Sequence, residues 1–103
     1  MKHWAGFVQA MAAQKEGDGN LLDNMLVYAH SDQEFAKIHS LDGIPMFTAG
    51  KAGGKLKTGY HIAGNTDPGT RLGYTLLKVM GVDTPTWGSK SNRTSKEISE
   101  ILA

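Results

Sequence analysis

Histidine and aspartate side chains gather in the central part of this sequence, where they could hold a divalent metal. His30 and Asp32 directly follow an apolar run over 25–29, and His39 and Asp42 come shortly before a second apolar run. In α/β proteins, ligands bind in the crevice outside the carboxyl ends of the strands. Neutral imidazole and carboxylate groups suit zinc, manganese and similar ions, and carboxylates also suit calcium. These four residues are therefore candidate metal ligands.

The same residues have a purely structural alternative. Ser31 and Asp32 are common capping residues, so they would stabilise the turn after the strand, with His30 only hydrogen-bonded. His39 and Asp42 would then be an ordinary loop pair. A serine nucleophile at Ser31 is a weaker hypothesis, because the sequence around it lacks the nucleophile-elbow motif.

A glycine- and lysine-rich stretch over 50–59 invites comparison with phosphate-binding loops. It follows an apolar run, but Ala49 stands where the first glycine of a P-loop belongs, and Leu56 replaces the hydroxyl residue. We therefore exclude a nucleotide-binding P-loop. Lys55 and Lys57 are candidates for binding sulfate or phosphate, and the alternative is that both are solvated.

The elements expected to position these residues form a small sheet with flanking helices. Apolar residues at helical spacing predict a helix that ends near Glu16. The runs 25–29 and 44–49 are almost wholly apolar, which indicates strands buried on both faces, and 59–63 is a plausible third strand. The intervening 33–38 is expected to be a loop. The residues of the predicted helix face are Trp4, Phe7, Val8 and Met11.

Helical signals return in the second half of the chain. Asp67-Pro68-Gly69-Thr70 predicts a helix start, and Gly81 predicts a left-handed stop. Capping-box spacing over 94–97 predicts a short final helix within a C-terminal extension at 89–103. The apolar stripe of the second helix consists of Leu72, Leu76, Val79 and Met80. We therefore expect one α/β domain over 1–103, with a mixed sheet of about three strands.

Composition excludes several classes of function. The chain has 103 residues, a net charge of +1 and no cysteine. A balanced charge disfavours nucleic-acid binding, and the lack of cysteine excludes disulfides and thiolate chemistry. We expect no membrane association, because no apolar run is long enough to span a bilayer and the first residues lack a signal-peptide core.

Several segments together resemble the C-terminal part of a large bacterial family of exported proteins of unknown function. That family is related to the alkaline-phosphatase and sulfatase-like superfamily. The resemblance covers most of positions 3 to 88. It rests on order and spacing over 17–24, the strand that follows, His39-x-x-Asp42-x-Ile44-Pro45, the stretch 49–61, and the helix that includes Leu76, Leu77, Met80, Gly81 and Val82.

The resemblance implies the C-terminal part of an α/β/α sandwich with a strand, a metal-binding loop and another strand. Asp32 and His39 occupy places comparable to metal ligands, which ranks them above His30 and Asp42. In the superfamily the nucleophile lies upstream of the matching region. The chain is then expected to be part of, or a short relative of, a hydrolase of phosphate or sulfate esters with an exported or periplasmic parent, without catalysis of its own.

The alternative is a noncatalytic α/β module that stands alone. A small, incomplete sheet leaves strand edges and apolar helix faces that proteins normally cover. We therefore expect the isolated chain to form a homodimer.

Overall fold

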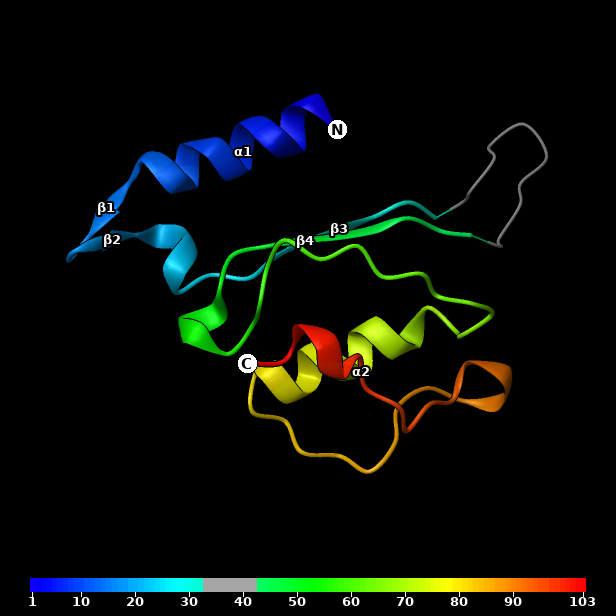
Figure 1. The fold of residues 1–103 in the computed structure, drawn as a ribbon. Coiled ribbons are helices and arrows are strands. Elements are labelled where there is room, and N and C mark those ends of the chain that lie inside the picture. Colours follow the sequence, from blue (N-terminus) through cyan, green and yellow to red (C-terminus); the bar gives the residue numbers. More distant parts are fainter. Residues whose placement is uncertain (33–42) are drawn as a thin grey trace. The chain divides into compact units, whose positions relative to one another are not determined.

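The computed structural model describes residues 1–32 and 43–103, which divide into two compact units, Met1–Gly54 and Lys55–Ala103 (Figure 1). The chain has α/β character, with two α-helices and two small antiparallel sheets of two strands each among these residues.

Unit 1 begins with helix α1, Lys2–Ala13, and continues directly into a short hairpin of β1, Lys15–Glu16, and β2, Gly19–Asn20. Gly17 lies at the first position of the two-residue turn with φ 58°, which fits the glycine that a type II′ turn needs there. The helix therefore ends before Glu16, because the chain reverses into a hairpin where the sequence predicted a last helical turn.

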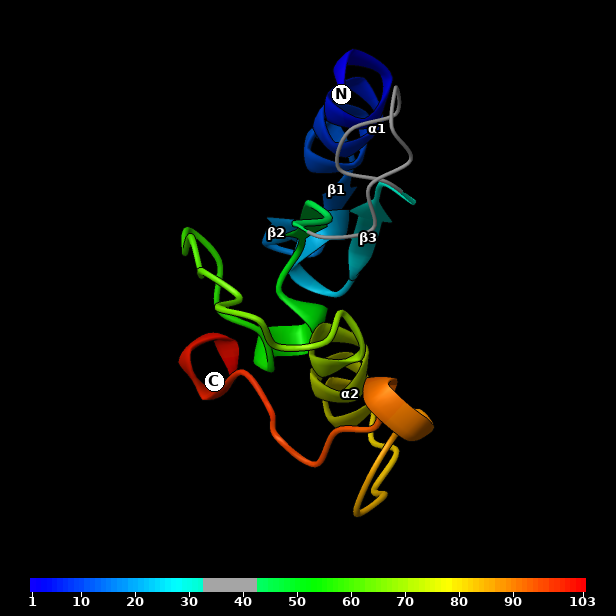
Figure 2. The same cartoon turned by 90° about the vertical axis from the view of Figure 1, so that its right-hand side faces the viewer.

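The main sheet of unit 1 pairs β3, Val27–His30, with β4, Met46–Ala49. Both predicted strands are confirmed, but they run antiparallel as a two-stranded ribbon. Figures 1 and 2 show α1 to one side of this ribbon, where the Trp4 ring lies 6.0 Å from the Phe47 ring. Tyr28 and Phe47 are 42% and 38% exposed, so the prediction of burial on both faces was wrong.

A close backbone approach follows β4. Gly50 is buried with φ 99°, and a Cβ atom built on it would lie 2.2 Å from the Met25 carbonyl oxygen. The next residues bond back across the unit, since Lys51 N–H donates to Leu22 O at 2.8 Å and Ala52 N–H donates to Met25 O at 3.0 Å. Only glycine fits this position, which joins the end of β4 to the 3-10 turn Leu21–Asp23.

Unit 1 has no buried apolar side chain among its described residues. Residues that the sequence placed in the core are half-buried or exposed, and Phe7 is 48% exposed. The four buried hydrophobic residues of the described chain, Leu56, Tyr74, Val79 and Ile101, all belong to unit 2.

Unit 2 is built around helix α2, Thr70–Val79. Val79 is buried as predicted, whereas Met80 is 66% exposed and does not join the apolar stripe. Gly81 has φ 84°, which confirms the left-handed stop. Leu56 pairs with Leu102 in an isolated antiparallel bridge, so the end of the chain packs beside the start of the unit.

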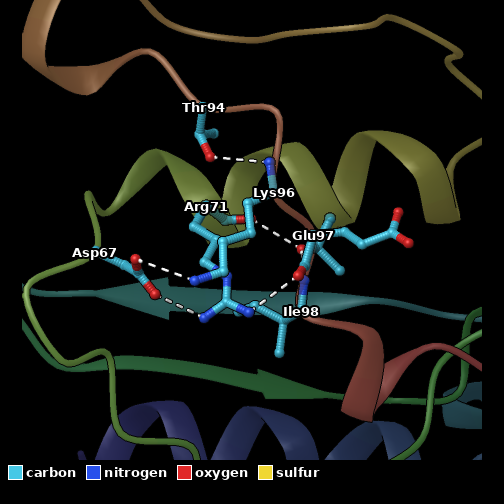
Figure 3. Close-up of polar contacts among 7 residues, drawn as sticks. Asp67, Arg71, Thr94, Lys96, Glu97 and Ile98 are labelled. Atoms are coloured by element: carbon cyan, nitrogen blue, oxygen red, sulfur yellow. Dashed lines mark hydrogen bonds and ion pairs between the residues drawn. The ribbon is translucent and has the colours of Figure 1, made fainter.

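Polar contacts fasten the last residues of unit 2 onto α2 (Figure 3). Arg71 donates to Asp67 at 2.8 Å and to the Glu97 carbonyl oxygen at 3.0 Å. The fully buried Thr75 hydroxyl donates to Arg71 O at 2.8 Å and accepts the Ile98 N–H at 2.9 Å. The segment 94–102, expected as an extension, therefore supplies part of the packing of this unit.

Two further expectations about elements were wrong. Residues 59–63 form no strand, and only Ile62 among them is even half-buried. The predicted final helix is a single 3-10 turn at Ser99–Ile101.

Candidate functional site

The carboxyl end of β3 carries the first of the predicted ligands. His30 is the last residue of β3, and its exposed ring stacks on Tyr28 with ring centroids 5.3 Å apart and planes 25° apart. Its Nδ1 lies 3.0 Å from the Ser31 carbonyl oxygen. Because side chains alternate along a strand, Tyr28 and His30 share one face of the ribbon. The histidine is therefore held by an aromatic neighbour and by the backbone carbonyl of the next residue.

His30 and Asp32 border the same open pocket at the end of the ribbon. Both residues are exposed, and the pocket has a volume of about 660 Å³. Its described lining consists of Met1, Ala29, His30, Ser31, Asp32, Pro45 and Phe47. The structure thus brings one imidazole and one carboxylate to a common, mostly apolar pocket.

The other two predicted ligands, His39 and Asp42, lie outside the described residues. Within residues 1–32 and 43–103, no three His, Cys, Asp or Glu side chains are grouped so as to hold a metal ion. A stable metal site needs three or four protein ligands. The described part of the chain therefore provides at most a pair, and the metal site stays a prediction.

The backbone of β3 and β4 has a second property that the sequence did not reveal. Ser31 N–H donates to Pro45 O at 3.3 Å, and pairs in an antiparallel ladder alternate between hydrogen-bonded and non-hydrogen-bonded. Opposed residues Tyr28 and Thr48 are therefore a non-hydrogen-bonded pair, as are His30 and Met46. Their backbone groups point to the outer edges of the ribbon, where no described backbone group pairs with them.

The predicted anion-binding lysines lie in unit 2 and take part in chain pairing. Lys57 N–H donates to Ile101 O at 2.8 Å, and Lys55 O accepts the Ala103 N–H at 3.1 Å. Both residues are exposed, and neither ammonium group forms an ion pair with a described carboxylate. Anion binding at Lys55 and Lys57 stays a prediction.

Two aromatic residues of the site were not predicted to be part of it. Tyr28 stacks on His30, and partial desolvation raises the pKa of its phenol. Phe47 lines the pocket and contacts Trp4. The signal for Tyr28 was present in the sequence, because it precedes His30 by two positions in a strand. Phe47 needed the strand register, which places it opposite Ala29.

Neither α-helix in the described part of the chain has the length and hydropathy to cross a membrane. Comparisons of the chain with protein-family models, with curated proteins and with solved structures gave no match.

Proposed function

We propose that this chain is a noncatalytic α/β module that acts by association, and that its first partner is a second copy of itself. The observation that carries the proposal is the contrast between the units: all four buried hydrophobic side chains of the described chain belong to unit 2. Unit 1 folds its backbone into a helix and two hairpins without burying one apolar side chain among its described residues.

Such a unit gains by covering its apolar surface. A two-stranded ribbon is marginal alone in water, and removing apolar area from water is worth about 25 cal/mol per Å². Unit 1 exposes Met1, Phe7, Tyr28 and Phe47, each more than a third accessible. Aromatic residues and methionine are enriched at protein interfaces, so these exposed side chains are of the kind that a protein partner covers.

Light scattering coupled to size-exclusion chromatography tests the proposal. We expect a homodimer at micromolar concentration, a shift towards monomer in Tyr28→Lys, and no shift in Tyr60→Lys. Tyr60 is a matched control, because it is 57% exposed and lies in unit 2. A wild-type chain that stays monomeric at hundreds of micromolar would overturn the proposal.

A second candidate function follows from the sequence resemblance and from one feature of the site. We propose, as the alternative, that the chain is the C-terminal part of a phosphatase- or sulfatase-like metal hydrolase without independent turnover. The supporting feature is that His30 and Asp32 border one pocket at the end of β3. In such a hydrolase, the metal activates a nucleophile and stabilises charge on a phosphoryl or sulfuryl oxygen.

Elemental mass spectrometry of the purified chain tests this alternative. We expect stoichiometric zinc, manganese or calcium that is lost in Asp32→Ala and His39→Ala and retained in Asp18→Ala and His61→Ala. Phosphate and sulfate esters should not be turned over. Equal metal content in all five proteins, or no metal in the wild type, would contradict this alternative. His30 and Asp32 at the end of β3 would then have a structural role only.

A further inference from the structure

We infer that the outer edge of β3 is the pairing surface, and that it takes β3 of a second copy in antiparallel register. This inference rests on the proposed self-association and names the strand that carries it. In the paired state, Tyr28 of each copy exchanges backbone hydrogen bonds with His30 of the other copy. Ala29 then lies at the twofold axis.

The hydrogen-bond ladder supplies the geometry. Because the Ser31–Pro45 bond fixes the alternation, the N–H and C=O groups of Tyr28 and His30 point away from β4. Antiparallel pairing about Ala29 brings Tyr28 of the first copy opposite His30 of the second copy. It also brings His30 of the first copy opposite Tyr28 of the second. Donors and acceptors then match on both sides, which is the self-complementarity that a twofold interface requires.

The side chains favour β3 over β4 as the pairing strand. Tyr28 and His30 are exposed, whereas Met46 and Thr48 on the outer edge of β4 are half-buried. Natural edge strands are normally protected by lysine, proline or a bulge, and the run Met25–His30 contains no charged side chain or proline. An edge without such protection fits a strand that is paired in the functional state.

The pairing also extends an aromatic contact that exists within one copy. Tyr28 and His30 stack with centroids 5.3 Å apart on one face of the ribbon. In the paired strands, each Tyr28 ring gains the His30 ring of the second copy as its directly opposed neighbour. Cross-strand pairs that include an aromatic side chain stabilise antiparallel sheets.

Sedimentation equilibrium of three variants tests the strand. In Tyr28→Pro the outward N–H is lost from both copies, so we expect dimer affinity to fall by about 100-fold. Thr48→Pro is the matched control, because it removes the outward N–H directly opposite on β4 and should leave the affinity within about threefold. Tyr28→Thr keeps the N–H, and its dimer should be stronger than that of Tyr28→Pro.

Hydrogen exchange of the unmodified chain provides a test that no folding defect can confuse. We expect the Tyr28 and His30 amides to be protected at concentrations that favour the dimer and to exchange faster on dilution. The outward amides of Met46 and Thr48 should exchange fast at both concentrations. A wild-type monomer would overturn both this inference and the proposed function. A dimer with fast Tyr28 and His30 amides would overturn only the pairing strand.

Discussion

At the scale of single residues, Thr75 has the clearest energetic role in unit 2. Its side chain is fully buried in α2, and its hydroxyl joins the helix backbone at Arg71 to the backbone N–H of Ile98. Threonine often bonds back to its own helix, but here the same oxygen also satisfies a donor from the last segment. The hydroxyl therefore couples α2 to residues far along the chain.

We expect Thr75→Val to destabilise unit 2 by about 1–3 kcal/mol, because the N–H of the half-buried Ile98 would lose its acceptor. Valine keeps the volume, so the loss reports the hydroxyl. Thr58→Val is the control: Thr58 is exposed, and its substitution should stay within about 0.5 kcal/mol. Urea denaturation measures the change in the free energy of unfolding for both variants. Equal midpoints for the two variants would contradict the role assigned to Thr75.

Asp23 makes the stability of unit 1 depend on pH in the acid range. The Asn20 backbone N–H donates to its Oδ2 at 3.0 Å and holds the pKa of the carboxyl below its usual 3.8, with a smaller effect from Lys51. Because the folded pKa is lower than the unfolded one, the stabilisation is fully present above pH 3.8. It is lost as pH falls through the folded value.

Asp23→Asn should therefore flatten the acid limb of the unfolding curve of unit 1 below about pH 4. Asp18→Asn, at the exposed turn between β1 and β2, should keep the wild-type limb. Thermal unfolding followed by circular dichroism between pH 2 and 6 makes the comparison. Identical acid limbs in the wild type and Asp23→Asn would show that the Asp23 carboxylate does not cause the loss of stability in acid.

At the scale of elements, glycine has different consequences in the two helices. A Cβ atom built on Gly73 of α2 would lie 2.0 Å from the Trp87 ring, whereas a Cβ on Gly6 of α1 meets no atom within 4 Å. The first glycine makes room for an aromatic ring. The second glycine, Gly6, only lowers the helix propensity of α1.

Gly6→Ala should thus stabilise the chain by about 0.5–1 kcal/mol, as alanine favours a helix over glycine. Gly73→Ala should instead destabilise it by about 1–3 kcal/mol, because displacement of Trp87 outweighs the same gain. Chemical denaturation followed by circular dichroism compares the two variants. Stabilisation by both would show that the Trp87 ring moves aside without cost.

The elements also show how far sequence reasoning reaches. The apolar spacing and the Gly81 stop predicted both α-helices, and the apolar runs predicted β3 and β4. The third strand failed because 59–63 offers one half-buried side chain, while Leu56, outside that window, makes the pairing contact. The hairpin of β1 and β2 was missed because the helical spacing was extended to Glu16, although Gly17 directly after it suits a type II′ turn.

The candidate site was less predictable than the elements. His30 and Asp32 were found because they follow an apolar strand. Their antiparallel setting depends on pairing between β3 and β4, which an apolar run does not encode. The exposure of Tyr28 and Phe47 could not be predicted for the same reason. A run of apolar residues indicates that a strand can be buried, but it does not specify which element covers the strand.

At the scale of the whole molecule, the chain combines two units with unequal cores. Unit 2 holds the four buried hydrophobic side chains, and unit 1 holds none among its described residues. Each unit contains one of the two tryptophans, Trp4 in unit 1 and Trp87 in unit 2. Fluorescence can therefore follow the two units separately.

We expect unit 1 to unfold at lower urea concentration than unit 2. Trp87→Phe leaves Trp4 as the reporter of unit 1, and Trp4→Phe leaves Trp87 as the reporter of unit 2. Circular dichroism of each variant checks that the substitution preserves the fold. Coincident transitions in both variants would show that the chain unfolds as one cooperative domain.

The bridge between Leu56 and Leu102 has a consequence for the order of folding. It joins the two ends of unit 2, so the chain between them must close into a long loop before the contact forms. Loop closure costs entropy that local helical contacts do not, and non-local pairing slows folding. The α2 helix should therefore form early, and docking of Leu102 beside Leu56 should complete the unit as a late, rate-limiting event.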